Sequence, residues 1–141
     1  MTDIATFLMY NEGAEEAFKF YTDTIKGSKL ISPLMFSIGD QKFYAYNGGP
    51  HFKFTEAISF SVDCKTQEEV DDFWEKLSEG GEQGQCGWLK DKYGLSWQIN
   101  PTVLSQMLGD PDPEKSKRVM EAMLRMKKID IKRLKQAYEQ K

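Results

Sequence analysis

The sequence predicts an α+β fold made of two similar modules, each with the element order βαβββ, followed by C-terminal helices. Two observations predict this fold. A strand pattern, an amphipathic helix and further strand patterns occur in that order, and the same order returns about fifty residues later. Each half also holds one helix followed by hairpin strands, which differs from the strict βα alternation of a doubly wound parallel sheet. We therefore expect curved mixed sheets around a cavity.

The first module is expected within residues 1–50. Residues 4–10 are rich in β-branched and aromatic side chains, which is typical of a strand. Apolar residues spaced three and four apart from Ala14 to Ile25 then predict a helix, with Gly27 placed to end it. The strands that follow are expected at residues 29–34, 35–38 and 42–46, with Gly39-Asp40 as a hairpin turn between the last two.

The second module is expected within residues 55–101. Apolar residues alternate with serines over residues 57–62, which predicts a half-buried strand. Thr66 and Glu69 have the spacing of a capping box, and Gly80-Gly81 ends the helix that follows. Two further strands are expected at residues 85–90 and 95–100, around a turn at residues 92–94.

A change in composition after Pro101 predicts the domain organisation. We expect residues 1–108 to form one domain and residues 109–141 to form a helical extension. Asp112 is predicted as the N-cap of one extension helix and Asp130 as the N-cap of a second, because a side-chain oxygen there can accept from a free backbone N–H.

Charge separates the extension from the rest of the chain. Residues 110–141 hold ten Lys and Arg against six Asp and Glu, a net charge of +4, whereas residues 1–109 hold nine against sixteen, a net charge of −7. We expect the basic extension to pack on its own acidic body or on a partner subunit. The overall charge of −3 argues against nucleic-acid binding through phosphate contacts.

Composition excludes several other classes. Of the 141 residues, 40% are hydrophobic and 29% are charged, so disorder is not expected. No run approaches the roughly 18 apolar residues that a membrane helix needs, and no signal peptide is expected in residues 1–10. Cys64 and Cys86 are interpreted as reduced thiols of a cytoplasmic protein. His51 is the one histidine, so a two-histidine zinc site cannot be built from this chain alone.

Three separated stretches resemble the PhnB-like family. They are residues 6–21, which begin TFLMY and end FY, residues 88–99 (WLKDKYGLSWQI), and residues 110–123, which begin DPDPEK and end VMEAM. This family is part of the glyoxalase/bleomycin resistance/dioxygenase (vicinal oxygen chelate) superfamily. The resemblance implies paired βαβββ modules and a homodimer.

The family is often labelled as a demethylubiquinone 3-methyltransferase, and the resemblance therefore implies methyl transfer as one activity. A nucleotide-like cofactor such as S-adenosylmethionine is commonly held by a Gly-rich turn between a strand and a helix. Here Gly48-Gly49 follows a hairpin strand and residues 80–84 follow a helix, so both are interpreted as turns and no cofactor is expected.

Metal-dependent members of the superfamily hold an ion with His and Glu side chains from four strands. The resemblance places Thr6, Ala57 and Gln98 at three of these positions, and Phe43 or Tyr44 at the fourth. Neutral hydroxyl and amide groups are poor ligands for Zn²⁺, Ni²⁺ or Fe²⁺. We therefore expect no transition metal at this position.

The leading hypothesis is a cytoplasmic homodimer that binds a small, partly apolar organic molecule without a metal. By strand alternation, Trp97 and Ile99 are expected in the core while Gln98 faces away from it. The expected pocket residues are Thr6, Leu8, Tyr10, Tyr44, Ser59, Trp88 and Gln98. Two alternatives stay open: a superfamily enzyme (a methyltransferase, or a metal-dependent lyase or transferase with ligands from a partner), or a structural or regulatory dimer with a vestigial cavity. The expected pocket side chains could also simply fill the interface between the modules.

Overall fold

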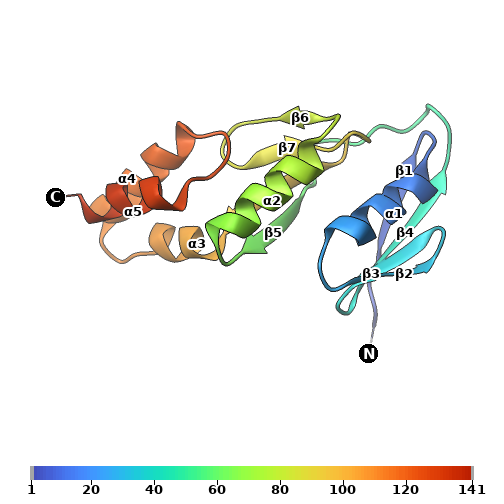
Figure 1. The fold of residues 1–141 in the computed structure, drawn as a ribbon, viewed down its shortest axis with the longest axis horizontal. Coiled ribbons are helices and arrows are strands. Elements are labelled where there is room, and N and C mark those ends of the chain that lie inside the picture. Colours follow the sequence, from blue (N-terminus) through green and yellow to red (C-terminus); the bar gives the residue numbers. More distant parts are fainter. Residues whose placement is uncertain (1, 141) are drawn as a thin grey trace. The chain divides into compact units, whose positions relative to one another are not determined.

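The computed structural model describes residues 2–140, and the chain divides into two compact units, Met1–Thr55 and Glu56–Lys141. Each unit contains one βαβββ module (Figure 1). The predicted fold class and the internal repeat are thus confirmed. None of the helices in the described residues has the length and apolar run needed to cross a membrane.

The first unit is a four-stranded mixed sheet with one helix on it. Its elements are β1 (Thr6–Tyr10), α1 (Ala14–Thr24), β2 (Ser28–Ser32), β3 (Met35–Ile38) and β4 (Gln41–Asn47). The strand order is β1-β4-β3-β2, with β1 parallel to β4 and the other pairs antiparallel. Gly39 has a positive φ of 58°, as the predicted hairpin turn between β3 and β4 requires.

Aromatic rings fill the space between α1 and this sheet. Phe18 of α1 lies edge-on to Phe36 of β3 at 4.5 Å between ring centroids, and Phe36 stacks on Phe43 of β4 at 4.6 Å. The Tyr10 hydroxyl donates to the Tyr21 hydroxyl at 3.1 Å, which satisfies two polar groups within the buried layer. This face of the sheet is therefore a filled core.

The second unit repeats the arrangement and adds three helices. Its elements are β5 (Phe60–Cys64), α2 (Gln67–Ser78), β6 (Glu82–Gln83), β7 (Trp88–Lys90), β8 (Ser96–Pro101), α3 (Thr102–Leu108), α4 (Pro113–Leu124) and α5 (Ile131–Glu139). The strand order is β5-β8-β7-β6, with β5 parallel to β8. Each strand thus has the same position in its sheet as its counterpart in the first unit.

Four details of this unit differ from the sequence-based expectations. The strand expected at residues 85–90 begins at Trp88, because residues 85–87 form a bend and a turn. The strand predicted from residue 57 begins at Phe60, because residues 56–58 form a turn and a bend in which Ile58 is 69% exposed. The short strand β6 and the helix α3 were not predicted. Strand β6 has two residues, too few for a periodic pattern, and α3 follows β8 directly without a side-chain cap.

The predicted helix starts are confirmed. Thr66 Oγ1 accepts from Glu69 N at 3.2 Å, and the Glu69 carboxylate accepts from Lys65 N at 3.3 Å. Asp112 and Asp130 cap α4 and α5 through their side chains, as expected. Local capping chemistry therefore determines where these helices begin.

The C-terminal helices pack on the second unit itself, which is one of the two outcomes predicted for the basic extension. A buried cluster joins α3, α4, α5 and the segment before α5, consisting of Leu104, Met107, Val119, Met126, Ile129 and Leu134. Ile129 and Leu134 flank Asp130, the N-cap of α5, as a hydrophobic staple does.

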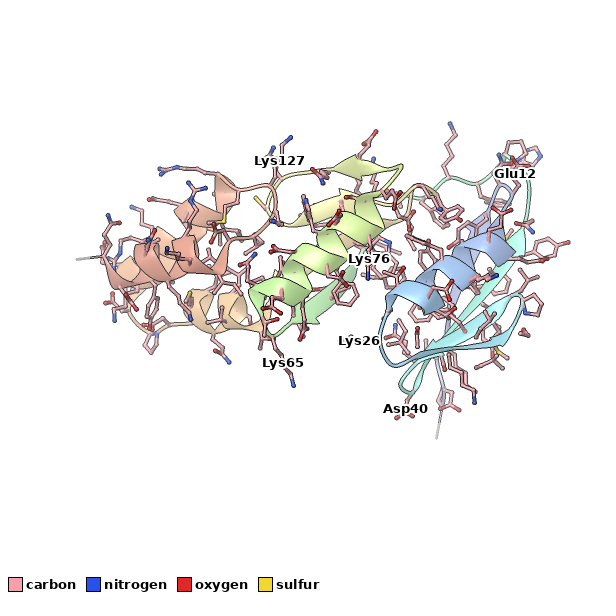
Figure 2. All side chains as sticks on the ribbon, in the orientation of Figure 1. Glu12, Lys26, Asp40, Lys65, Lys76 and Lys127 are labelled. Atoms are coloured by element: carbon pink, nitrogen blue, oxygen red, sulfur yellow. The ribbon has the colours of Figure 1, made fainter. Side chains whose placement is uncertain are left out.

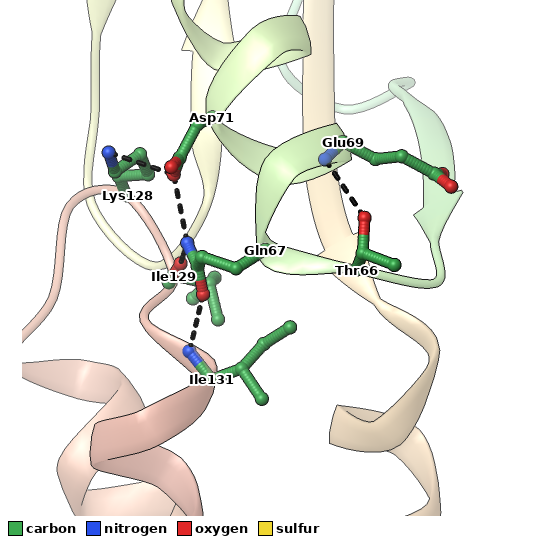
Figure 3. A network of polar contacts seen from close by, with 7 residues as sticks. All are labelled: Thr66, Gln67, Glu69, Asp71, Lys128, Ile129 and Ile131. Atoms are coloured by element: carbon green, nitrogen blue, oxygen red, sulfur yellow. Dashed lines mark hydrogen bonds and ion pairs between the residues drawn. The ribbon is translucent and has the colours of Figure 1, made fainter.

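The side chain of Gln67 connects the extension to α2 (Figure 3). Its Nε2 donates to the carbonyl oxygen of Ile129 at 2.9 Å, and its Oε1 accepts from the backbone N–H of Ile131 at 2.8 Å. Asp71, one turn further along α2, accepts from Gln67 at 2.9 Å and forms an ion pair with Lys128 at 2.9 Å. One amide therefore satisfies a backbone donor and a backbone acceptor of the segment that leads into α5.

A second connection is made by the loop before β7. Cys86 N donates to Met126 O, and Gly87 N donates to Lys127 O, both at 2.8 Å. Cys86 has a φ of +59°, a left-handed conformation that is unfavourable by about 1 kcal/mol or more for a residue with a Cβ. The hydrogen bond from its N–H to the extension helps to hold this conformation.

Replacement of Gln67 tests the connection to α2. We expect Gln67→Ala to lower the free energy of unfolding by about 1–3 kcal/mol, because the backbone groups of Ile129 and Ile131 lose their partner. Urea denaturation followed by tryptophan fluorescence measures the change. The exposed Gln136 of α5 provides a matched control, and Gln136→Ala should alter stability by less than about 0.5 kcal/mol. Equal stability of the two variants would show that the connection is not stabilising.

Candidate small-molecule site

The sheet of the second unit has two chemically different faces. Leu89, Trp97 and Ile99 are buried on the side of α2, as expected from strand alternation. The opposite side, here called the polar face, carries the residues that alternate with them. They are Ser59, Ser61, Asp63, Trp88, Lys90, Ser96, Gln98 and Asn100. Other charged side chains, such as Lys65, Lys76 and Lys127, extend from the outer surface of this unit, where they are exposed (Figure 2).

Hydrogen bonds between side chains order the polar face. Gln98 Nε2 donates to Ser59 Oγ at 2.9 Å, and Asn100 Nδ2 donates to Ser61 Oγ at 2.9 Å and to Gln98 Oε1 at 3.4 Å. These bonds link β8 to Ser61 of β5 and to Ser59, which directly precedes β5. The second N–H of Gln98 and the hydroxyl hydrogens of both serines are left for other acceptors.

Trp88 lies next to the hydrogen-bonded side chains of Ser59, Gln98 and Asn100, here called the ladder. It is the register partner of Gln98 across the antiparallel β7–β8 pair, so both side chains project from the polar face. Its ring is half-buried. A flat apolar surface beside fixed polar groups is the usual composition of a site for small organic molecules.

The carboxylate of Asp91 sets the geometry of the β7–β8 hairpin. Its Oδ1 accepts from Tyr93 N at 2.9 Å and from Leu95 N at 3.1 Å, and its Oδ2 accepts from Trp97 Nε1 at 2.9 Å. The sequence predicts the turn but does not indicate this role of Asp91. An Asp three residues before a glycine with a φ of +89° is a turn signal that could have indicated it.

A pocket of about 220 Å³ opens beside β6 and β7. All of its lining residues belong to the second unit: Glu56, Glu82, Gln83, Gly84, Trp88, Leu89, Lys90 and Ser96. Lys90 Nζ forms an ion pair with Glu56 Oε1 at 2.6 Å at this pocket. Trp88 is the one expected site residue that lines the pocket. The sequence did not indicate the other polar lining residues Lys90, Ser96 and Glu56 as site residues.

The expected site residues of the first unit lie on different faces of its sheet. Leu8 and Tyr10 are buried in the aromatic core against α1, and Thr6 shares their side of β1. Tyr44 lies on the other side, where its ring stacks on Phe7 at 6.4 Å between centroids. Alternation grouped Thr6, Leu8 and Tyr10 correctly, but it does not say which face the helix covers. Leu8 and Tyr10 are therefore core residues of the first unit.

The donor groups at the superfamily's metal positions do not fit a transition metal. Ala57 and Phe43 have no donor atom, and the Gln98 amide already bonds to Ser59 and Asn100. Thr6 offers a neutral hydroxyl, and Tyr44 offers a phenol. Within residues 2–140, no three or more His, Cys, Asp and Glu side chains gather closely enough to hold a metal ion.

Cys64 is chemically unsuited to act as a nucleophile. Its side chain is buried at the end of β5, and burial, followed by the negative charges of Glu69 and Asp63, raises the pKa of the thiol to about 12. A thiol with this pKa stays protonated at neutral pH, whereas the thiolate is the reactive form.

The described fold is that of the glyoxalase/bleomycin resistance proteins. Solved structures whose sequences are less than 25% identical to this chain share the fold, and such a similarity supports the fold but not a function. PA1353 from Pseudomonas aeruginosa is 19% identical, with a TM-score of 0.59 over 72% of this chain and 98% of that one. The hypothetical protein SA1046 from S. aureus is also 19% identical, with a TM-score of 0.52 over 70% of this chain and 92% of that one.

Closer similarity shows the family. Residues 31–100 match the family described as 3-demethylubiquinone-9 3-methyltransferase. A PhnB protein from Bacillus cereus, which bears the same methyltransferase designation, is 32% identical, with a TM-score of 0.66 over 72% of this chain and all of that one. No curated protein matches at a significant level. The chain belongs to the PhnB-like family of the glyoxalase/bleomycin resistance/dioxygenase superfamily, as its three sequence stretches indicated.

Substitution of Asp91 tests the hairpin geometry. We expect Asp91→Ala to lower the free energy of unfolding by about 2–4 kcal/mol, since three N–H groups lose their acceptor in the interior. Asp91→Asn keeps one acceptor oxygen, so it should lower the free energy of unfolding by only about 1–2 kcal/mol. Urea denaturation measures both. The surface variant Asp72→Asn, which removes an exposed ion pair with Lys76, should change stability by less than about 1 kcal/mol. An Asp91→Asn variant as stable as the parent would contradict this role.

Thiol labelling tests the state of the cysteines. In the native protein at pH 8, iodoacetamide should leave Cys64 unmodified for hours, because its pKa of about 12 and its burial suppress the thiolate. After unfolding in urea, Cys64 should react at the rate of an ordinary cysteine. Peptide mass spectrometry distinguishes Cys64 from Cys86. Rapid modification of Cys64 in the folded chain would show that this thiol is accessible and ionised.

Proposed function

We propose that this protein binds a small, partly apolar organic molecule on the polar face of its second sheet, without a metal ion. The observation that carries the proposal is the ordered ladder of Ser59, Gln98 and Asn100 beside the ring of Trp88. Fixed hydrogen-bonding groups next to an aromatic surface give a ligand both orientation and contact area.

The polar groups suit a neutral ligand. Each ladder residue is an amide or a hydroxyl, and none of them carries a charge that would need a counter-ion. Gln98 can donate through its second N–H, and Ser59 can donate through its hydroxyl. Trp88 would contribute apolar area on the same face. The absence of a fitting donor set at Thr6, Ala57 and Gln98 supports binding that uses hydrogen bonds alone.

Several wider expectations belong to the same proposal. We propose that the protein is a cytoplasmic homodimer that does not bind nucleic acid. We also propose that residues 1–108 form the glyoxalase/bleomycin resistance-like domain and that residues 109–141 form its helical extension. Tyr44 and Phe7 offer an aromatic surface in the first unit on which an apolar molecule can also pack.

An enzymatic alternative follows from the name of the family and of the Bacillus cereus relative, which designates a 3-demethylubiquinone-9 3-methyltransferase. Such an enzyme needs a methyl donor. Neither Gly48-Gly49, after β4, nor residues 80–84, after α2, forms the turn from a strand into a helix that commonly holds S-adenosylmethionine. We therefore favour binding without methyl transfer.

Two measurements test the proposal. Elemental analysis of the full-length protein should find well under one equivalent of Zn, Ni or Fe per chain. Titration with phenol, followed by ¹H–¹⁵N NMR, should shift the Gln98 side-chain amide and the Trp88 indole resonance. Gln98→Ala should weaken phenol binding about three- to tenfold, as expected for the loss of one hydrogen bond.

A matched control and two contrary outcomes make this test decisive. Gln106→Ala, at an exposed position of α3, should leave phenol binding unchanged. One tightly bound transition metal per chain would refute the metal-free site. Calorimetric binding of S-adenosylmethionine, with phenol shifts located away from the polar face, would favour the methyltransferase instead.

A further inference from the structure

The pocket beside β6 and β7 contains a buried hydroxyl whose bonding capacity is unused. Ser96 is 1% exposed, and within residues 2–140 its Oγ has no hydrogen-bond partner. Buried polar groups are normally paired, because an unpaired group loses its bonds to water. Since Ser96 lines the pocket, a ligand atom there can supply the partner.

Lys90 provides a second donor next to this hydroxyl. Lys90 and Ser96 are register partners across β7 and β8, so their side chains leave the same face of the sheet as neighbours. The ammonium group has three N–H bonds, and Glu56 Oε1 accepts one of them at 2.6 Å. Glu56 also raises the pKa of Lys90, which therefore stays charged at neutral pH.

The charges around the pocket select against ionic ligands. Glu56 balances Lys90, and Glu82 adds a second carboxylate to the lining. An anionic ligand would meet a lining whose net charge is negative, and an ammonium ligand would offer no acceptor to Ser96 Oγ or Lys90 Nζ. A neutral ligand with a carbonyl oxygen can accept hydrogen bonds from Ser96 Oγ and Lys90 Nζ, and it is not repelled by the two carboxylates.

The walls of the pocket favour a flat molecule. Trp88 supplies a ring, and Gly84 lies against the Trp88 backbone, where its N–H donates to the Trp88 carbonyl oxygen at 2.8 Å. A Cβ at Gly84 would lie 2.9 Å from the carbonyl oxygen of Trp88, so only glycine permits this approach. Planar rings that stack on an indole use such a surface efficiently.

We propose that this pocket binds a neutral planar molecule through a carbonyl oxygen that accepts from Ser96 Oγ and Lys90 Nζ. The inference rests on the proposed function and specifies the ligand class of the same face. Trp88 connects the two parts, because it lines the pocket and pairs with Gln98 of the ladder.

Three probes of similar shape and different charge test the ligand class. Benzamide is neutral and offers a carbonyl oxygen, benzoate is an anion, and benzylamine is a cation. Titration of the full-length protein, followed by ¹H–¹⁵N NMR, should show benzamide binding at least five times more tightly than the other two. The shifts should centre on the backbone amide of Ser96 and the indole of Trp88.

Two variants test the two donors. Ser96→Ala should weaken benzamide binding about fivefold, the usual effect of one hydrogen bond. This variant should fold at least as stably as the parent, because it removes an unpaired buried hydroxyl. Lys90→Met leaves Glu56 and Glu82 without their cation, so the preferred probe should change from benzamide to benzylamine. Ser105→Ala and Lys132→Met, both at exposed positions, are the matched controls and should change nothing.

The outcomes separate this inference from the proposed function. Equal binding of the three probes, tightest binding of benzoate, or an unchanged affinity in Ser96→Ala would overturn the inference. Phenol shifts at Gln98 together with no benzamide shift at Ser96 would refute the carbonyl pocket and leave the proposed function intact. Absence of phenol shifts at Gln98 together with retained benzamide binding at Ser96 would refute the proposed site at the ladder and leave the carbonyl pocket intact.

Discussion

The carboxylate of Asp91 is the constraint on which the candidate site depends. Buried at the end of β7, it accepts from two backbone N–H groups of the turn and from the indole of Trp97. The turn fixes the register of β7 against β8, and the indole bond fixes the core side of β8. With that side fixed, alternation directs Ser96 and Gln98 to the opposite face. The Asp91 carboxylate thus determines which side chains of β8 lie in the core of the second unit and which lie on its polar face.

The fold was predictable because its determinants are local. The hairpin at Gly39, the cap at Thr66 and the caps at Asp112 and Asp130 all depend on residues within four positions of one another. The order of the elements in the two modules followed from the internal repeat. The short strand β6 gave no pattern because two residues cannot show a period, and α3 was missed because it follows β8 without a capping side chain.

The candidate site was less predictable, because it depends on contacts between segments far apart in the sequence. Alternation predicted that Gln98 faces away from the core, and in the structure Gln98 donates to Ser59 and is the register partner of Trp88. Alternation alone could not show that α1 covers Leu8 and Tyr10, since β1 has large apolar residues on both faces. The pairing of Lys90 with Glu56 links residues 34 positions apart, and no sequence pattern indicates it. The unpaired hydroxyl of Ser96 is likewise visible only once its surroundings are known.

The loop bonds from Cys86 and Gly87 to Met126 and Lys127 have a consequence for synthesis on the ribosome. The first unit ends at Thr55, and all its strands and its helix lie before that point. The second unit needs acceptors that are translated about forty residues after the loop that uses them. Its strands can form earlier, but the loop N–H groups stay unpaired until the segment before α5 has emerged. The nascent chain therefore completes its two halves at different times, and the interval is set by the translation of residues 56–127.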